Sequence, residues 1–483
     1  MVRFVAALLV AACLFCGVAF AVEEPQTDNP DPFAEFWHNI MKNPFKDTGT
    51  FDPNTTFGYM MENLELGGYL RLRYESTELR PIPKVFGPSP VFPGGADLAQ
   101  YGDDWGDWVS ERAQFYITIP ITPDLRFRGE AINLNVLGDK ARFRATPAGD
   151  LPSVPSRDPA ITDPEIQLYQ GFGEWDNFIT RGLGAKVGRQ EINYGEGWII
   201  SDQPFYSGFT FDAAKVQVKT EQATIDFIAA EVSTIYKPQG PSYPRIYGAY
   251  CTYAAEESTN FDFFGFFNND EMNQQDNGIK ADFVDESRWT LGSRLHGNIL
   301  SDVDYDLNTA YQLGHTGPSA TALHEQDDVS AYALQGGIGK TFQEAPWTPR
   351  IGGKAAYASG DKDPDNTKNH AYNPLYRNLH ALNGYADAVK FSNLIDYALE
   401  GSVKPYDRIT IGTEGHVFFF ADRPANLSNK LAKELDFFTK VKASENLSFE
   451  VAYAMFVQDR AFRDATGDRQ HNQRVYFQLE YAF

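Results

Sequence analysis

The last ten residues of the chain, 474–483, alternate strictly between apolar and mostly polar side chains. The apolar set is Val475, Phe477, Leu479, Tyr481 and Phe483. Because successive side chains of a β-strand point to opposite faces, this segment has one apolar face and one polar face. Ten residues tilted by roughly 45° are about enough to cross a bilayer as a strand. A final strand of a soluble sandwich with one buried face is the alternative.

Residues 1–21 have the features of a secretory signal peptide. A basic residue precedes a long apolar stretch, which ends in a small-x-small cleavage site formed by Ala19 and Ala21. A lipoprotein-type site ending at Cys13 is the alternative. Cleavage near Ala21 would leave Cys251 as the single cysteine, so we expect no internal disulfide in the exported protein.

After this segment the sequence has no run of 18 consecutive apolar residues, so no second transmembrane helix is predicted. A chain without such a helix can cross a bilayer only as a closed β-barrel, which satisfies every backbone hydrogen-bonding group. The formal net charge is −23, which argues against a nucleic-acid partner.

From residue 64 onward the sequence alternates repeatedly between apolar and polar positions. We predict eighteen strands, at 64–75, 108–119, 124–135, 165–175, 183–191, 210–219, 222–233, 243–255, 259–267, 288–297, 303–314, 328–341, 348–359, 394–404, 408–420, 434–443, 446–457 and 472–483. Short links such as 120–123 alternate with long ones such as 76–107. Segregated loop lengths and an even strand number are typical of an outer-membrane barrel, with short turns in the periplasm and long loops outside.

The prediction is therefore an all-β, transmembrane antiparallel β-barrel of about 18 strands over residues 61–483. It follows the signal peptide, 1–21, and an N-terminal periplasmic segment, 22–60. A ring of this size leaves an open lumen, whereas an eight-stranded barrel is filled by its own side chains. The polar strand faces should line that lumen, because a charge on the lipid face costs about 2–4 kcal/mol at the midplane.

Charged residues on the polar faces predict the chemistry of the lumen. The candidate substrate-path residues are Arg71, Arg73, Arg112, Arg126, Arg128, Arg294, Arg350 and Lys354. The first five lie on three consecutive strands, so we expect one basic patch on the inner wall. Rings of Arg and Lys favour anions. The alternative is that these side chains pair with acidic residues across strands and only keep the lumen hydrated.

Three motifs stand out in the predicted barrel. They are Val-Gly-Arg-Gln-Glu-Ile-Asn-Tyr-Gly-Glu-Gly from residue 187 with Phe-Asp-Ala-Ala at 211–214, Ala-Ser-Gly-Asp-Lys-Asp-Pro at 358–364 with Asn-Pro-Leu-Tyr at 373–376, and Gly-Tyr at 384–385 with Phe-Ser-Asn-Leu at 391–394. Together they resemble the alginate-export family of bacterial outer-membrane porins. The resemblance implies an 18-stranded barrel whose Arg-lined constriction passes acidic polysaccharide outward. Arg189 and Glu191 match the first motif and become candidate constriction residues. They share the parity of Ala185 and Val187, so a β-bulge would be needed to turn them inward.

The terminal strand ending in Phe483 also resembles the assembly signal of outer-membrane barrels. We therefore expect this protein in the bacterial outer membrane, as a passive channel for export or diffusion of an anionic, alginate-like polysaccharide or oligosaccharide. A general diffusion porin for small polar solutes is the alternative. The expected partners are the anionic or polar saccharide, outer-membrane lipid and periplasmic export or assembly proteins. A surface adhesin is disfavoured by the charged wall.

Neither catalysis nor a bound cofactor is predicted. His296 and His416 lie on polar strand faces, but the chain has no Gly-x-Ser-x-Gly motif for a nucleophilic serine. The aspartates at 361, 363 and 365 resemble the start of a calcium loop, yet Asn366 and Tyr372 occupy the positions that need glycine and glutamate. We therefore expect no metal site of the EF-hand type.

Overall fold

The computed structural model describes residues 56–78, 105–138, 166–205, 208–233, 244–256, 258–272, 284–299, 302–316, 327–363, 366–424, 426–467, 469 and 471–483. The predicted signal peptide and most of the predicted segment 22–60 lie outside these residues. The described part contains three short helices, α3 (Thr56–Glu62), α4 (Leu379–Leu382) and α5 (Arg460–Thr466). None of its helices is long and apolar enough to span a bilayer.

Strands account for most of the described chain. They are β1 (Glu65–Glu78), β2 (Trp105–Pro120), β3 (Leu125–Gly138), β4 (Gln167–Trp175), β5 (Leu183–Gln190), β6 (Phe211–Lys219), β7 (Ala223–Val232), β8 (Arg245–Glu256), β9 (Thr259–Met272), β10 (Val284–Ile299), β11 (Val303–Thr316), β12 (Asp327–Thr341), β13 (Arg350–Ala358), β14 (Lys368–Asn369), β15 (Leu394–Tyr406), β16 (Ile409–Phe420), β17 (Lys430–Lys442), β18 (Leu447–Gln458) and β19 (His471–Ala482). Each of the eighteen predicted strands is present, with limits shifted by a few residues.

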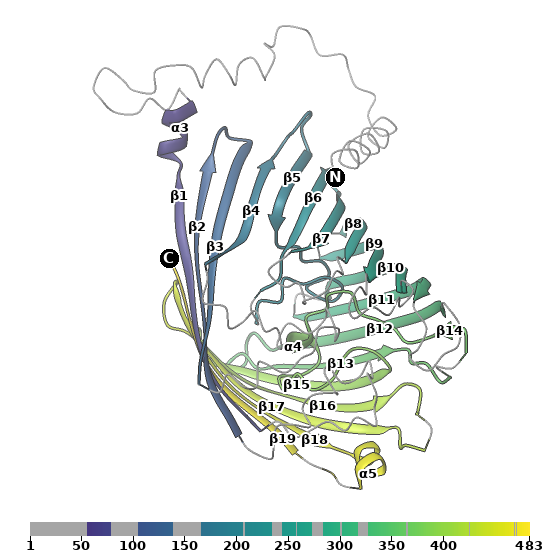
Figure 1. The fold of residues 1–483 in the computed structure, drawn as a ribbon. Helices are drawn as coiled ribbons and strands as arrows, with labels where there is room; N and C mark the ends of the chain where they lie inside the picture. Colours follow the sequence, from purple (N-terminus) through teal and green to yellow (C-terminus); the bar gives the residue numbers. More distant parts are fainter. Residues whose placement is uncertain are drawn as a thin grey trace.

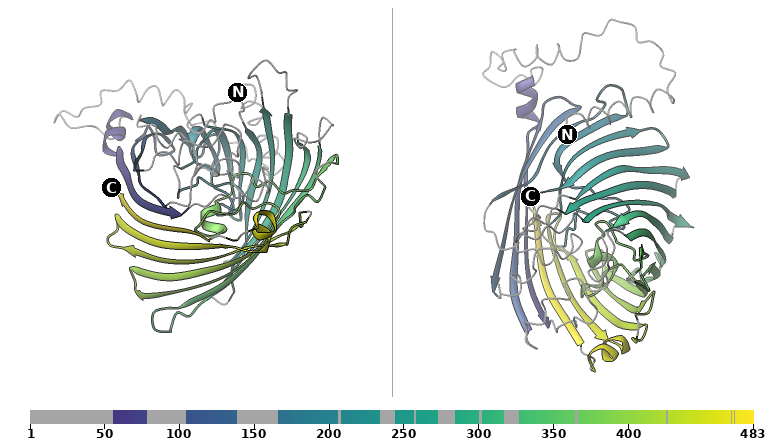
Figure 2. Two further views of the ribbon diagram at one scale, coloured as in Figure 1. Left: turned by 60° about the horizontal axis from the view of Figure 1, so that its bottom comes forward. Right: turned by 45° about the vertical axis from the view of Figure 1, so that its right-hand side comes forward.

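The strands form one closed antiparallel ring (Figures 1 and 2). Each strand pairs with its neighbour in sequence, and β1 closes the ring by pairing with β19. The two-residue β14 is an exception, because it lies parallel to the start of β12 while β13 pairs directly with β15. Of the 19 described strands, β14 is therefore outside the ring, which leaves 18. The predicted fold class is confirmed.

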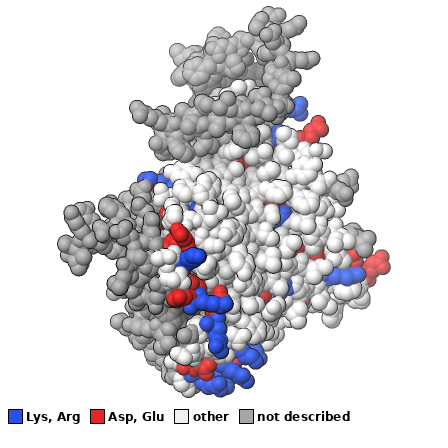
Figure 3. All heavy atoms as spheres, turned by 90° about the vertical axis from the view of Figure 1, so that its right-hand side faces the viewer, with Lys and Arg blue, Asp and Glu red and all other residues white. Residues whose placement is uncertain are grey.

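Alternating side chains divide each strand between two environments. On β1, Arg71 and Arg73 are only 3% and 4% exposed, whereas Leu72 and Tyr74 are 39% and 38% exposed. The exposed apolar side chains form the outer face, where uncharged residues cover a broad area and charges gather toward its margins (Figure 3). Apolar side chains outside and polar ones inside are what a strand needs between lipid and a hydrated lumen.

Connection lengths separate the two ends of the barrel. Residues 121–124 join β2 to β3, 407–408 join β15 to β16, and 443–446 join β17 to β18. Since strands alternate in direction, these short turns share one end of the ring with the start of β1 and the end of β19. The longer connections, such as those after β5 and β13, leave from the opposite end. The predicted segregation of loop lengths is therefore present in the structure.

Two of the long connections fold into the barrel instead of away from it. We call residues 191–205, after β5, the first inward loop, and residues 370–393, before β15, the second inward loop. A parallel bridge between Ile200 and Tyr376 joins them, and α4 lies inside the ring (Figures 1 and 2).

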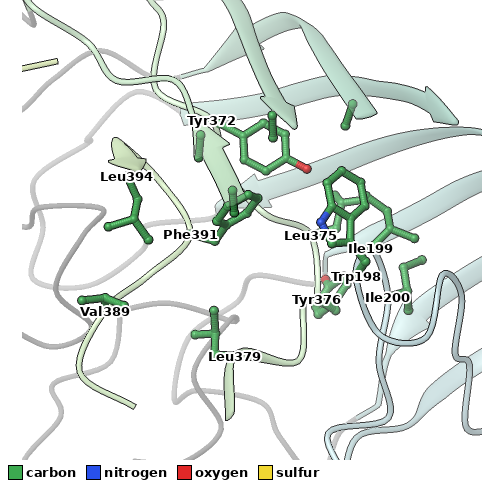
Figure 4. Packing of buried hydrophobic residues seen from close by; sticks show 14 of the residues in the cluster. Trp198, Ile199, Ile200, Tyr372, Leu375, Tyr376, Leu379, Val389, Phe391 and Leu394 are labelled. Atoms are coloured by element: carbon green, nitrogen blue, oxygen red, sulfur yellow. The ribbon is translucent and has the colours of Figure 1, made fainter. Parts of the chain in front are cut away.

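Buried apolar side chains from both inward loops pack together within the lumen. They include Trp198, Leu375 and Phe391, with Tyr372 beside them (Figure 4). The barrel thus encloses a hydrophobic core of its own, in which the rings of Trp198 and Phe391 meet edge to face at 6.4 Å. Such dense packing gives the two loops defined positions on the inner wall.

Candidate functional site

Four arginine side chains from the adjacent strands β19, β1 and β2 point into the barrel at neighbouring positions. Arg71 and Arg112 are cross-strand partners, and Arg73 lies two residues further along β1. Arg474 of β19 is the cross-strand partner of Thr77. All four arginines are buried, and none is more than 8% exposed. We call Arg71, Arg73, Arg112 and Arg474 the arginine cluster.

The first inward loop places two backbone carbonyls against this cluster. Arg71 donates through Nη1 to the carbonyl oxygens of Pro204 at 2.8 Å and Phe205 at 2.6 Å. Arg73 donates to the Phe205 carbonyl at 2.5 Å, and Arg112 donates to the Pro204 carbonyl at 3.3 Å. Three guanidinium groups therefore converge on two neighbouring carbonyl oxygens, which accept hydrogen bonds without neutralising the charge.

Two carboxylates also pair with members of the cluster. Glu75 accepts from Arg73 Nε at 2.7 Å and from Arg474 Nη2 at 2.5 Å. Asp387, which belongs to the second inward loop, pairs with the same Arg474. These ion pairs are buried, so removing either partner would leave an uncompensated charge of high cost. They link the closing strands of the barrel to the second inward loop.

Phe205 joins the two inward loops to each other. Its ring stacks on that of His380, with centroids 3.4 Å apart and planes 12° from parallel. His380 Nδ1 lies 3.1 Å from Asp387 Oδ1. Burial lowers the pKa of His380 below its usual 6.5, against the opposing effect of Asp387. The imidazole is therefore neutral at neutral pH, and Nδ1 is the nitrogen that donates to Asp387.

Glu191, at the start of the first inward loop, lies beside the arginine cluster. The hydroxyl of Tyr169 donates to the Glu191 carboxylate, and the same hydroxyl accepts from Arg112 Nη2 at 3.2 Å. Burial raises the pKa of Glu191, while the bond from Tyr169 and the charge of Arg112 counteract that shift. The predicted candidate Glu191 is thus brought next to Arg112, although it sits in the loop and not on the strand.

Arg294 holds the tip of the first inward loop to the opposite side of the ring. Its guanidinium pairs with Asp306 on β11 and with Glu196 of the loop, the latter at 3.0 Å. Glu196 stands between two glycines, and all three residues have positive φ, at 64°, 51° and 80° for Gly195, Glu196 and Gly197. A glutamate in the left-handed region is strained, and the pair with Arg294 helps to fix this turn.

Buried carboxylates on β17 anchor the second inward loop. Asp436 accepts from the backbone N–H of Tyr385 at 3.3 Å, and Glu434 accepts from that of Ala386 at 2.7 Å. Lys354 of β13 donates to the backbone of the same loop, 2.9 Å from a carbonyl at the end of α4. The loop is therefore held by wall residues of both β13 and β17.

The remaining predicted basic residues are paired with acids on the wall. Arg126, Arg128 and Arg350 lie toward the short-turn end, and Lys354 lies beside α4. Their respective acidic partners are Glu174 at 2.9 Å, Glu130 at 2.9 Å, Asp304, and Glu414 at 3.2 Å. This arrangement gives mixed charge along the wall, so the buried concentration of arginines at β19, β1 and β2 stands out.

The prediction that Arg189 lines the constriction is wrong, because its side chain lies on the outward face of β5. It shares that face with the exposed Val187, and it pairs with its cross-strand partner Asp212 at 2.8 Å. The β5–β6 ladder continues without a register shift, so no bulge turns Arg189 inward. Strand parity therefore keeps this member of the family motif out of the lumen.

The predicted single basic patch is also wrong in its extent. Arg112 lies opposite Leu134 on β3, whereas Arg128 lies opposite Thr118. Arg128 is therefore six positions (134 minus 128) nearer the short-turn end, or about 20 Å at ~3.3 Å per residue. Arg126 lies further still. The patch divides into the arginine cluster and a separate pair near the turns.

Sequence reasoning missed the loop residues that meet the arginine cluster. Pro204 and Phe205 follow the first motif without belonging to it, and His380 and Asp387 lie between the matching segments of the other two. Nothing in their immediate sequence shows that they turn inward. A signal exists only in hindsight, because two long connections carry unusually many large apolar residues for external loops.

The closed ring, its apolar exterior and its charged interior define the class of protein as a transmembrane β-barrel channel. The family model for alginate export matches residues 154–477, and this chain belongs to that family. The family and the fold are those of an outer-membrane channel.

Solved structures of Pseudomonas aeruginosa proteins share the fold at low sequence identity. The structure of OpdK with vanillate aligns with a TM-score of 0.55 and 10% identity, covering 87% of this chain and 99% of that chain. OccK3 (OpdO) aligns with a TM-score of 0.54 and 11% identity, covering 87% and 96%. OccK5 (OpdH) aligns with a TM-score of 0.53 and 10% identity, covering 87% and 98%. No curated protein sequence matches the chain.

Proposed function

We propose that this protein is a passive outer-membrane channel for an anionic, alginate-like saccharide. The protein reaches the outer membrane after a signal peptide is cleaved near Ala21. The observation that carries the proposal is the arginine cluster, four buried guanidinium groups that face the interior where both inward loops meet the wall. Arginine matches a carboxylate in geometry as well as in charge. Membership of the alginate export family supports the same class of solute.

A general diffusion porin is the second candidate. It is favoured by the paired wall charges, in which Arg126, Arg128 and Arg350 each have an acidic partner. Paired charges hydrate a wall without selecting strongly between anions and cations. The two proposals differ in whether the cluster or the mixed wall controls passage.

Planar-bilayer recording separates the two functions. A channel for acidic saccharides should show a reversal potential shifted toward anions in a salt gradient. A hexasaccharide of uronic acids should block its current more strongly than a neutral glucose hexasaccharide of equal length. Equal block by both, with no ion preference at low salt, would establish the general porin instead.

A further inference from the structure

Residues 203–205, which we call the strap, are anchored at their start and rest on charged donors at their end. Gln203 is buried, and its side-chain amide donates to the carbonyls of Tyr376 at 3.2 Å and Arg377 at 2.8 Å. Pro204, by contrast, is exposed, and Phe205 is half-buried. The carbonyls of these two residues are the ones that meet the arginine cluster.

The strap presents neutral acceptors to charged donors. Arg71, Arg73 and Arg112 all donate to its carbonyls, within 2.5–3.3 Å. A carboxylate carries a full negative charge and can accept two parallel bonds from one guanidinium, whereas a backbone carbonyl is neutral and offers a single oxygen. The two carbonyls therefore occupy a site whose donors would be better satisfied by a carboxylate.

We propose that the strap is an internal stand-in for the acidic groups of the solute. In the resting channel its carbonyls occupy the arginine cluster, and a carboxylate-bearing saccharide displaces Pro204 and Phe205 during passage. This inference rests on the proposed function and adds the way in which the solute gains access to the arginines. A neutral saccharide has no such preference for the released state and leaves the strap in place, because a ligand shifts an equilibrium only by its differential affinity.

Displacement exchanges one set of hydrogen bonds for another. The bonds that Arg71 and Arg73 lose to neutral carbonyls are replaced by bonds to an ionised carboxylate, which add the attraction between opposite charges. The ring of Phe205 must also leave Arg73, which lies 3.8 Å from its centroid, and His380, on which it stacks. The second inward loop keeps its own anchors on Asp436 and Glu434 and its bonds from Gln203, so Pro204 and Phe205 can move without it.

A distance measurement between two spin labels tests this movement. One nitroxide is attached at Pro204→Cys and the other at Glu445→Cys, an exposed position in the short turn between β17 and β18, both in a Cys251→Ser background. Pulsed electron double resonance is recorded alone, with a hexasaccharide of uronic acids, and with a neutral glucose hexasaccharide. A control pair, Glu221→Cys with Glu445→Cys, joins two short turns of the rigid ring.

We expect the acidic hexasaccharide to add a second distance population for the strap pair and to leave the control pair unchanged. The neutral hexasaccharide should change neither. If the acidic sugar blocks current in bilayers while the strap distance stays the same, the strap is fixed and the inference is overturned, although the proposed function stands. If the acidic sugar neither blocks current nor moves the strap, both the inference and the proposed function fail.

A second variant keeps the inference testable should the acidic sugar bind weakly. Phe205→Ala, added to the strap pair, removes the ring that lies between Arg73 and His380. The displaced population should then appear without any sugar and grow further with the acidic one. A strap that stays in its resting position in this variant, even with the acidic hexasaccharide, overturns the proposal.

Discussion

Arg73 holds Phe205 in two ways at once. Its guanidinium carbon lies 3.8 Å from the centroid of the phenyl ring, and its Nη1 donates to the carbonyl of the same residue at 2.5 Å. A cation over an aromatic ring and a charge-assisted hydrogen bond reinforce each other at a desolvated site. One wall residue of the first strand thereby fixes both the side chain and the backbone of the first inward loop.

Asp387→Asn should loosen the second inward loop. The carboxylate of Asp387 pairs with Arg474 and accepts from His380, and breaking a buried ion pair by removing one partner costs about 3–5 kcal/mol. Because an asparagine keeps the shape and one acceptor, we expect about 1–3 kcal/mol here. Amide hydrogen exchange followed by mass spectrometry should show a loss of protection over residues 380–390.

Asp363→Asn is the matched control for that variant. It makes the same chemical change in the same connection between strands, but at an exposed side chain. Exchange over residues 380–390 should match that of the parent. Equal exchange in all three proteins would mean that Asp387 does not hold the loop.

Replacing arginines on β1 and β3 should change ion selectivity in two distinguishable ways. The double variant Arg71→Ser with Arg73→Ser removes two side chains that donate hydrogen bonds to the strap. Because the strap is then held less firmly, conductance should rise, and the reversal potential should shift toward cations. Arg128→Ser leaves the strap in place and should produce only a smaller shift. Both shifts should shrink as salt is raised, since the Debye length falls from about 10 Å at 0.1 M to about 3 Å at 1 M.

Arg189→Ser provides the control for charge alone. It also removes one arginine, but from the outward face, where it pairs with Asp212. Selectivity should not change in this variant. A shift as large as that of the β1 double variant would show that total charge, and not the lumen wall, sets the ion preference.

Acidification should weaken the contact between the inward loops. Burial holds the pKa of His380 below its usual 6.5, so the imidazole is neutral in the resting channel. Well above pH 6.5 the imidazole is neutral in both the resting and the released states, and the contact is fully stable. As pH falls below 6.5, His380 gains a proton in the released state but not in the resting state. The free energy that favours the resting state over the released state then falls by up to about 1.4 kcal/mol per pH unit. This fall ends when the pH reaches the lowered pKa of His380 in the resting state.

The strap spin-label pair reports this change. Its displaced population should grow as pH is lowered from about 8 to about 5, the range in which histidine titrates. The groups that face His380 include Asp387, Arg73 and Arg474. His380→Gln removes the imidazole alone and should abolish the part of the transition near pH 6. A transition that persists in this variant assigns it to other groups.

Much of the fold follows from period-two alternation and loop length, both of which are local properties. The strand containing Arg71 and Leu72 could be assigned to its two faces because lipid and water demand opposite side chains. β14 was not predicted, since a two-residue strand that pairs parallel with β12 has no periodicity of its own. Its pairing depends on where a long connection runs.

The candidate site was only partly predictable, for reasons of register and loop path. Parity places Arg73 and Arg112 inside, but only the ladder shows that Arg128 lies at a different level. Local sequence does not determine that Pro204 lies against Arg71, 133 residues earlier in the chain. Contacts of such long range arise when tertiary packing brings a loop to a wall, which no motif records.

Phe483 closes the seam of the barrel on Gly68. The backbone N–H of each residue donates to the carbonyl of the other at 3.0 Å. A Cβ added to Gly68 would lie 2.4 Å from the Phe483 ring and 2.8 Å from the backbone carbonyl of Gln114. The exposed ring can swing aside, but the carbonyl belongs to the neighbouring strand and cannot.

Gly68→Ala should therefore strain the seam by about 1–3 kcal/mol, the usual cost of overpacking. Deletion of Phe483 should remove both terminal hydrogen bonds. Each change should lower the temperature at which the folded, fast-migrating form is lost on a heat-modifiable gel. The deletion should also reduce insertion into the outer membrane while secretion continues. Gly129→Ala is the control, because its added Cβ would meet nothing nearer than Ile117 at 3.7 Å. If the Gly68 and Gly129 variants melt alike, the terminal pairing does not limit the stability of the ring.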